Sequence, residues 1–236
     1  ELSISLNQKA DLAIDPPSWP TTAYIDSSVS VPFTVRNIGT AQAAGFTNAI
    51  KVGSATKWSS NSMTLSKNAS ALAEPNPASF LYQVPMGSCG LIVYAQADEN
   101  SNIAESNESN NLTSKVVIKV KPPESPGKPT IPKGGIKQTS LTLQWYNSKG
   151  EIGFDVYRKK VSVDTKYTKI KTLSKNATTF SDTALSCGTA YTYYIEANTP
   201  IGCGGDVTGP SIQMTTLGWF QRSRTHAAYS FLAASL

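Results

Sequence analysis

Residues 97–113, ADENSNIAESNESNNLT, form an acidic, Asn-rich stretch that lies between two apolar segments. The segment before it reads LIVYAQA (91–97), and the segment after it reads VVIKV (116–120). Short apolar runs rich in β-branched residues, separated by Asn, Asp and Ser, are typical of two strands joined by a loop. We therefore predict a β-hairpin here, and we name the loop of residues 97–113 the crown.

Alternation of apolar and polar residues extends this prediction to the rest of the chain. Val29, Val31, Phe33 and Val35 recur with a period of two, which places one strand face in a core and the other in water. Further expected strands span residues 46–52, 80–84, 141–145, 154–158, 167–173, 178–180, 191–197 and 211–216. No segment of ten or more residues has a convincing helical period, so we predict an all-β fold of two sandwiches in series.

Length and composition agree with a modular protein of short strands joined by turns. The chain has 236 residues, enough for two domains of ordinary size, of which 39% are hydrophobic and 16% charged. No apolar run approaches the ~18 residues that span a bilayer, so no membrane insertion is expected. The chain starts at Glu1 without a signal peptide, and we expect a mature or excised piece of a longer exported protein with neighbouring domains.

A change in composition marks the domain boundary. Residues 121–132, KPPESPGKPTIP, contain five prolines, which favour a short, semi-rigid linker. Residues 1–121 carry 8 basic and 9 acidic side chains, whereas residues 122–217 carry 11 basic and 7 acidic ones. We expect one domain at 1–121, a second and more basic domain at 122–217, and a tail, 218–236, that is disordered or non-native.

The first domain resembles the CARDB family, the cell-adhesion-related domain found in bacteria. The matching residues are Val35, Arg36, Asn37, Ile38, Gly39, Thr40 and Ala41, together with Asp98, Asn102, Glu105, Asn107, Glu108, Asn110 and Asn111 of the crown. We expect Asn37 and Gly39 to supply turn chemistry, since both residue types tolerate positive φ. The resemblance implies an immunoglobulin-like sandwich in large secreted or surface proteins of bacteria and archaea. The Ser- and Ala-rich middle, 53–77, departs from it and leaves the strands there undefined.

The second domain is similar to a fibronectin type III domain. The matching residues are Pro126, Pro129, Trp145, Val156, Tyr157, Arg158, Leu185, Gly188, Tyr191, Tyr193, Ala197, Asn198 and Gly202. We expect Trp145 to fill the core and the Tyr191 hydroxyl to bond backbone upstream of it, which fixes a corner of the sandwich. Together the two resemblances imply two immunoglobulin-like sandwiches in tandem.

Catalytic chemistry is not expected. A Ser-His or Cys-His nucleophile requires an imidazole, and the one histidine, His226, lies in the tail. The three cysteines lack the spacing of a zinc site, and no glycine-rich phosphate loop precedes a helix. No base-stacking or groove-reading element indicates nucleic acid. We therefore expect a protein that is not an enzyme and has no cofactor, with Ca²⁺ as the one candidate ion.

The crown is the candidate Ca²⁺ site because it concentrates oxygen donors, which hard cations prefer. These donors are Asp98, Glu99, Asn100, Asn102, Glu105 and Glu108. The alternative is that Asp and Asn side chains close their own turns by accepting neighbouring backbone amides.

A basic set in the second domain is the candidate polyanion site, for which acidic polysaccharide or lipopolysaccharide would be a natural partner. It comprises Arg158, Lys159, Lys160, Lys169 and Lys171, with Lys166 and Lys175 nearby. The alternative is a solvated strand edge that lysine protects from aggregation. A weaker sugar-binding signal comes from aromatic residues that we expect to be largely core residues: Trp19, Trp58, Tyr191, Tyr193 and Tyr194.

The cysteines suggest a disulfide between the domains. Cys89 and Cys187 each precede the sixth strand of their domain, and Cys203 follows that strand in the second one. Cys187 and Cys203 flank a strand of about eight residues, which sets them too far apart to bridge. Head-to-tail stacking of two sandwiches would bring Cys89 to Cys203. We predict this bridge, with Cys187 left for a following module; the alternative is three unpaired thiols.

From these features we expect a non-catalytic segment of a secreted or cell-surface bacterial adhesin-like protein. It would act as a semi-rigid spacer and interaction module for a protein or surface polysaccharide partner. Two alternatives stay open: an ancillary carbohydrate-associated region of a secreted polysaccharide-degrading enzyme, and a subunit or decoration of an extracellular filament or virion.

The disulfide prediction is checked by alkylating the unfolded chain without reductant and measuring its intact mass. A Cys89–Cys203 bridge leaves one thiol, Cys187, to be modified. Three labels per chain would exclude the bridge, and prior reduction is the control that must give three.

Overall fold

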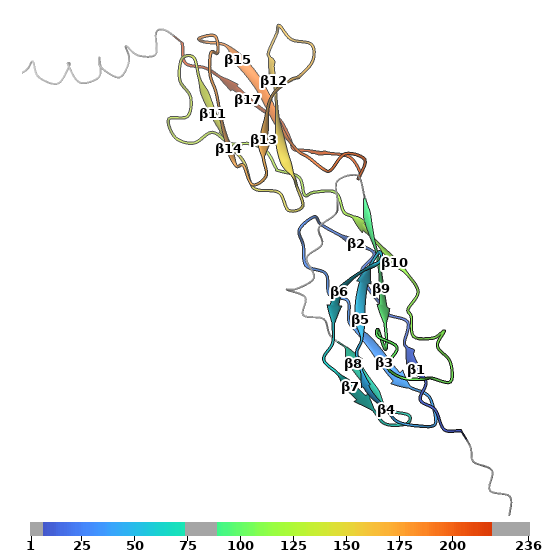
Figure 1. The fold of residues 1–236 in the computed structure, drawn as a ribbon. Helices are drawn as coiled ribbons and strands as arrows, with labels where there is room; N and C mark the ends of the chain where they lie inside the picture. Colours follow the sequence, from blue (N-terminus) through green and yellow to red (C-terminus); the bar gives the residue numbers. More distant parts are fainter. Residues whose placement is uncertain (1–6, 74–88, 219–236) are drawn as a thin grey trace, which may run out of the picture. The chain divides into compact units, whose positions relative to one another are not determined.

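The computed structural model describes residues 7–73 and 89–218, and the chain divides into two compact units, Glu1–Lys121 and Pro122–Leu236 (Figure 1). Throughout the described ranges the chain forms strands and turns and no helix, so the predicted all-β class is confirmed. The strand expected at 80–84 and the tail from residue 219 lie outside the described residues. The semi-rigid linker stays a prediction.

Unit 1 contains two main sheets and one additional strand pair. The three-stranded sheet has the order β1 (Leu12–Ile14), β3 (Phe33–Asn37), β8 (Ser70–Ala73). The five-stranded sheet has the order β2 (Thr22–Ala23), β10 (Val116–Val120), β9 (Gly90–Gln96), β5 (Ala49–Val52), β6 (Ala55–Ser59). The additional pair is β4 (Ala43–Phe46) with β7 (Met63–Leu65). The Ser- and Ala-rich middle therefore contributes β6, β7 and β8.

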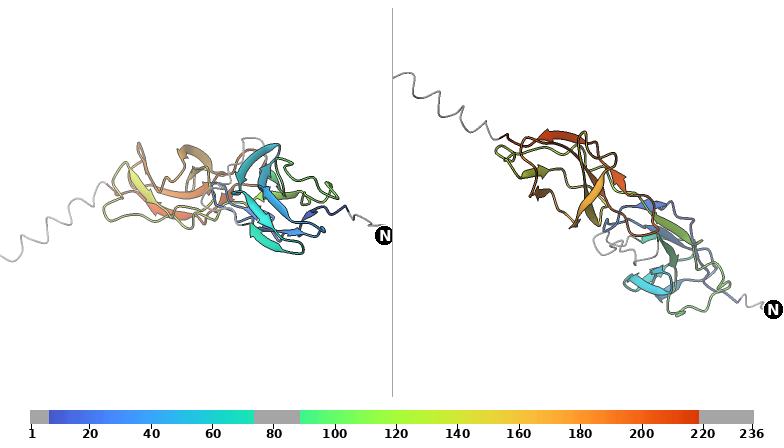
Figure 2. Two further views of the ribbon diagram at one scale, coloured as in Figure 1. Left: turned by 60° about the horizontal axis from the view of Figure 1, so that its bottom comes forward. Right: turned by 90° about the horizontal axis from the view of Figure 1, so that it is seen from above.

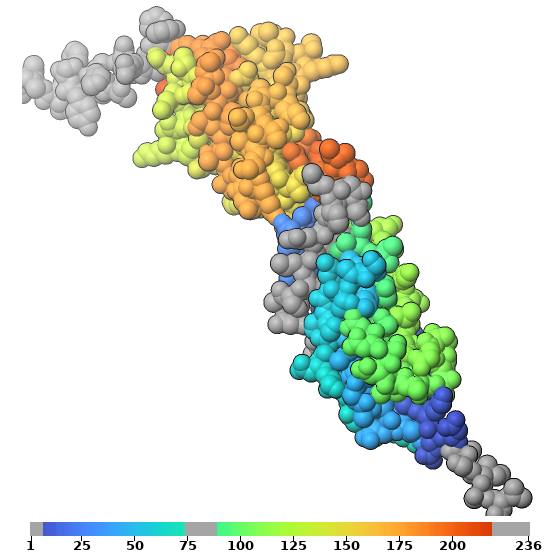
Figure 3. Space-filling model, viewed as in Figure 1, coloured from blue at the N-terminus to red at the C-terminus, as the bar shows by residue number. Residues whose placement is uncertain are grey.

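Both sheets of unit 1 contribute to its core through alternate residues. Phe33 and Val35 of β3 are buried, as are Val93 of β9 and Ile118 of β10. The predicted hairpin is present, since β9 and β10 pair antiparallel on either side of the crown. In the space-filling view the crown is the green region at the surface of this unit, next to the dark-blue N-terminal strand (Figure 3).

Unit 2 is a second sandwich. One sheet pairs β11 (Leu141–Gln144) with β14 (Thr179–Asp182). The other has the order β13 (Thr168–Ser174), β12 (Gly153–Lys160), β15 (Ala190–Ala197), β16 (Val207–Thr208), and β17 (Ile212–Thr215) also pairs with β15. The long β12–β13 hairpin and β15 can be followed in each view (Figures 1 and 2).

Aromatic residues organise unit 2 as the sequence predicts. Trp145 is 6% exposed and packs edge-on against Phe154 with ring centroids 5.8 Å apart. The Tyr191 hydroxyl accepts the backbone N–H of Ser186 at 3.0 Å, which fixes the loop before β15 to that strand. Part of the expected linker packs on this unit as well: the N–H of Glu124 donates to the carbonyl of Lys149.

Asn37 and Gly39 hold unit 1 together in a way that the sequence interpretation missed. Neither residue has positive φ, so the conformational reason we gave for their turn chemistry is wrong, although the Gly39 N–H does close an Asx-type turn by donating to Oδ1 of Asn37 at 3.1 Å. The buried Asn37 side chain instead meets four backbone groups: its Oδ1 accepts the N–H of Asp11 and of Gly39, and its Nδ2 donates to the carbonyls of Ala41 and Leu65. A Cβ at residue 39 would collide with the backbone of residues 9–11, so only glycine permits this close approach.

We expect Asn37→Ala to destabilise unit 1 by about 2–4 kcal/mol, because it leaves two N–H groups and two carbonyls without their buried partner. Urea unfolding should show a lower midpoint with an unchanged slope. Asn61→Ala is the matched control, since Asn61 is exposed and its loss should cost less than about 0.5 kcal/mol. Equal midpoints for the two variants would contradict the structural role of Asn37.

Candidate functional site

The crown closes on itself through Asp98. This residue is 2% exposed, has a φ of 45°, and accepts the backbone N–H groups of Asn102 at 3.0 Å and Ile103 at 2.8 Å. Two accepted amides stabilise the tight turn that follows β9. The neighbouring amide groups also bond to the protein, Asn100 to the Thr47 hydroxyl and Asn102 to the carbonyl of Gly45.

Glu105 ties the crown to the first strand. Its side chain is 5% exposed, with one carboxylate oxygen accepting the backbone N–H of Leu12 and the other accepting Nδ2 of Asn111 at 2.8 Å. Glu108 supports the same turn by accepting the N–H of Glu105. Burial raises the pKa of Glu105, although the two donors act against this rise. The crown thereby joins β1 to the β9–β10 hairpin of the other sheet.

Glu99 bonds to the edge of the five-stranded sheet. Its carboxylate lies 2.7 Å from Nζ of Lys51 and accepts the hydroxyls of Thr56 at 2.5 Å and Ser59 at 2.7 Å. Burial by itself would raise the pKa of Glu99, but these three donors lower it below its ordinary value. Glu99 is therefore a charged, fully engaged carboxylate that links the crown to β5 and β6.

The structure thus gives every carboxylate of the candidate Ca²⁺ set a partner within the protein. Asp98 and Glu105 accept donors inside the crown, and Glu99 points to a different strand edge. Within residues 7–73 and 89–218 no three His, Cys, Asp or Glu side chains are grouped to hold a metal. The contacts are those of the turn-chemistry alternative, which we therefore favour over the candidate Ca²⁺ site, and the comparison of Ca²⁺ with EDTA given below tests the choice.

Two members of the candidate polyanion set, Arg158 and Lys169, form ion pairs within unit 2. Nη1 of Arg158 lies 2.8 Å from the Asp182 carboxylate, which also accepts the Tyr193 hydroxyl at 2.8 Å. Nζ of Lys169 lies 2.8 Å from the buried Asp155. These contacts keep the charge of both cations close to a carboxylate.

The other three lysines of the set differ. Lys159 places its amine 5.1 Å from the centre of the Tyr167 ring. The amines of Lys160 and Lys171 form no ion pair with any residue that the structure describes, and Lys171 is exposed. The set is therefore not one uniform basic surface, and polyanion binding by it stays a prediction.

Most of the aromatic candidates are core residues. Trp19, Tyr191 and Tyr193 are at most 7% exposed. Tyr194 is half-buried and stacks on Tyr157 with ring centroids 4.6 Å apart, so the two rings cover each other's faces. Burial and the neighbouring Glu196 raise the pKa of Tyr157 to about 12. Each ring therefore has one face covered by the other, and Tyr167 packs edge-on against Tyr194 with ring centroids 4.8 Å apart.

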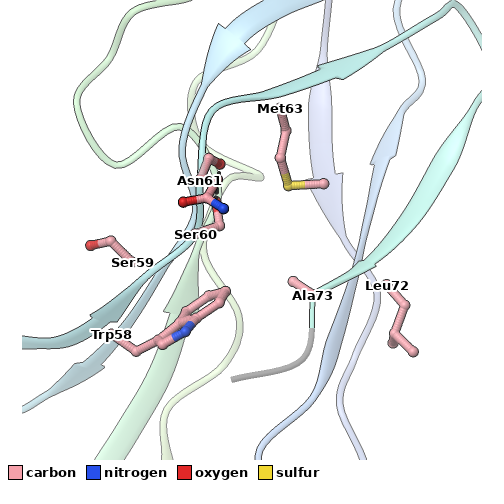
Figure 4. A pocket seen from close by; sticks show the side chains of 7 residues that line it. All are labelled: Trp58, Ser59, Ser60, Asn61, Met63, Leu72 and Ala73. Carbon is pink, nitrogen blue, oxygen red and sulfur yellow. Dashed lines mark hydrogen bonds between the residues drawn. The ribbon is translucent and has the colours of Figure 1, made fainter. Parts of the chain in front are cut away.

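Unit 1 has a hollow of about 330 Å³ between β6 and β8 (Figure 4). Trp58 and Asn61 lie on one side of it and Met63 and Ala73 on the other, whereas the Ser59 side chain points away, toward Glu99. The Trp58 ring also packs edge-on against Phe33 with ring centroids 6.3 Å apart. The lining is mainly apolar and carries no charged group.

A second hollow, of about 310 Å³, lies in unit 2 beside the end of β11. It is lined by Lys128, Thr130, Gln144, Trp145, Tyr146 and Thr178. Tyr146 is 82% exposed, the most exposed aromatic residue that the structure describes. Our sequence interpretation did not select this residue, although the alternation Leu141, Leu143, Trp145 on the buried face assigns Tyr146 to the outer face.

Of the cysteines, Cys187 is a free, half-buried thiol that donates to the carbonyl of Leu217 at 2.9 Å. The Cys89–Cys203 bridge would join the two units and stays a prediction. Within the described part of the chain no helix has the length and apolarity that crossing a bilayer requires.

Comparison with known proteins gives one family match, to CARDB over residues 9–115, as the sequence resemblance predicts. No curated protein matches the chain. One similar solved structure is the CARDB domain of the PF1109 protein from Pyrococcus furiosus in complex with di-metal ions, with 16% identity and a TM-score of 0.40, and the match covers 49% of this chain and 97% of that one. A second is a human fibronectin type-III domain, with 18% identity and a TM-score of 0.34, covering 44% of this chain and 94% of that one. A third comprises the FN1–FN3 domains of chicken CNTN1, with 14% identity and a TM-score of 0.36, covering 88% of this chain and 66% of that one. Both families named from the sequence are thus among the matches.

We expect excess Ca²⁺, compared with EDTA, to leave the unfolding midpoint of unit 1 unchanged. The crown carboxylates already accept internal donors, and a cation that bound only the folded state would raise the midpoint by mass action. Thermal unfolding of the full chain in both solutions measures this. A Ca²⁺-dependent rise that Glu108→Gln abolishes would instead establish the crown as a metal site.

Proposed function

Because residues 9–115 match the CARDB family, we propose that the chain is a non-catalytic, semi-rigid interaction segment of a secreted or cell-surface protein. CARDB and fibronectin-type modules together indicate a cell-surface or adhesion-related role at the coarser level. The finer role proposed here is that of a spacer that presents loops and strand faces to a partner, either a protein or a surface polysaccharide.

The observation that carries the proposal is that acidic side chains of both units accept donors from the protein itself. A carboxylate that acts in acid–base catalysis or holds a catalytic metal has to face the substrate or the ion. In this chain two carboxylates of the crown, Glu99 and Glu105, accept protein donors, while Asp155 and Asp182 pair with Lys169 and Arg158. Such contacts support a structural role for these carboxylates.

The same contacts also favour a mechanically rigid module, because they connect the two sheets of each sandwich. Glu105 bonds to β1 from the β9–β10 hairpin, and Asp182 of β14 bonds to Tyr193 and Arg158 of the opposite sheet. Each unit therefore has polar side chains that cross between its sheets, in addition to its apolar core. Crossing hydrogen bonds of charged groups are stronger than neutral ones.

We expect the full chain to release no product from a panel of polysaccharides, peptides and chromogenic esters above the level of a heat-denatured sample. The reason is that Glu99, Glu105, Asp155 and Asp182 accept internal donors, and a carboxylate engaged in this way is not directed at a substrate. Product release would be followed by chromatography and absorbance.

Turnover that follows the folded protein through two independent purifications would contradict a non-catalytic role. It would favour the alternative of an enzyme-associated region.

A further inference from the structure

The aromatic ring of Tyr146 is exposed to solvent and takes no part in the core of unit 2. Leu141, Leu143 and Trp145 fill the buried face, and the next residue, Tyr146, is 82% exposed. A tyrosine ring combines an apolar face with a polar hydroxyl, so its exposure is informative where other large apolar residues are buried. Gly127 lies next to the ring and has no side chain that could cover it, since a Cβ there would be 3.9 Å from Cδ2 of Tyr146.

Hydrogen-bonding groups surround this ring. Thr130 and Gln144 pair through their backbones, with N···O distances of 2.7 and 2.9 Å, so both side chains lie at the same point of the sheet. With Lys128, Trp145, Tyr146 and Thr178 they line the hollow of about 310 Å³. This volume is at the lower end of the ~300–1,000 Å³ typical of ligand sites. The Gln144 amide has no side-chain hydrogen bond within the described residues.

The charge at the hollow is available for a ligand. Lys128 is exposed, and its amine forms no ion pair with the residues that the structure describes. By contrast, Arg158 and Lys169 of the basic set lie 2.8 Å from Asp182 and Asp155. An anionic ligand would have to compete with a carboxylate at these two cations, and it would meet no such competitor at Lys128.

An exposed aromatic face, an amide, hydroxyls and one cation are the groups that recognise an acidic sugar. The ring can pack on the C–H face of a pyranose, the Gln144 amide and the Thr178 hydroxyl can exchange hydrogen bonds with its hydroxyls, and Lys128 can pair with its carboxylate. The Thr130 hydroxyl donates to the Gln144 carbonyl at 3.3 Å and can still accept a hydrogen bond from the sugar. We propose that unit 2 binds an acidic, uronate-containing polysaccharide at this hollow. The inference rests on the proposed function, since it names the partner class of the interaction segment.

The test is an NMR titration of the ¹⁵N-labelled full chain with tetragalacturonic acid and with its methyl ester. We expect the acid to shift the backbone amides of Lys128, Gln144 and Tyr146. The uncharged ester should bind more weakly, and salt should weaken the binding of the acid. Tyr146→Ala and Lys128→Ala should each weaken it by at least about fivefold, equivalent to ~1 kcal/mol.

Two matched controls keep the result specific. Ile201→Ala removes another fully exposed apolar side chain, 95% exposed, and Lys171→Ala removes an exposed lysine of the basic set; both should leave the affinity unchanged. The proposal is overturned if millimolar acid shifts none of the three amides, if Lys171→Ala rather than Lys128→Ala weakens binding, or if an oligoglutamate binds the hollow more tightly than the sugar.

The two proposals fail in different ways in the same samples. Absence of binding removes the polysaccharide site and leaves the spacer function standing. Shorter oligosaccharides formed during the titration would contradict the non-catalytic function, whereas the shifts at Tyr146 would still establish the site.

Discussion

One buried amide, that of Asn37, is the constraint on which the closed end of unit 1 depends. It satisfies four backbone groups from segments that the sequence keeps apart, and Gly39 allows those segments to approach. Unit 2 has a corresponding group in Asp182, which receives both Arg158 and Tyr193 from the other sheet. A buried polar group that has all its partners specifies one arrangement of the chain, because any other arrangement leaves it unpaired. Each sandwich is therefore defined by a polar contact inside an apolar core.

Much of the fold follows from local pattern. The alternation around Phe33 and Val35 predicts β3, and the segment 191–197 predicts β15 almost to its ends. The strands β6, β7 and β8 were not predicted, since Ala, Ser and Lys give no clear period of two there, and pairing with β5, β4 and β3 decides their conformation. The role of Asn37 was missed for the same reason: its partners Asp11 and Leu65 are close only in the folded chain.

The candidate site was predicted less well than the fold, because charge is visible in a sequence but pairing is not. The basic set was chosen by residue type, and Arg158 and Lys169 have carboxylate partners 24 and 14 residues away. Conversely, Tyr146 follows a core tryptophan in the sequence, and nothing in its residue type marks it as a binding residue. Its exposure follows only from the alternation along the strand, in which successive side chains point to opposite faces of the sheet. The oxygen-rich crown gives the same lesson, since donors from Leu12 and Lys51 decide what its carboxylates do.

The bond between Glu105 and the N–H of Leu12 also sets an order of events during folding, because the two residues are 93 positions apart in the chain. Closing so large a loop costs conformational entropy before the contact repays it, and topologies of this kind fold slowly. The first strand must therefore wait, unheld by the crown, until almost the whole unit has left the ribosome. A unit that is closed by so distant a contact completes its sandwich late, after the strands between the two residues have been made.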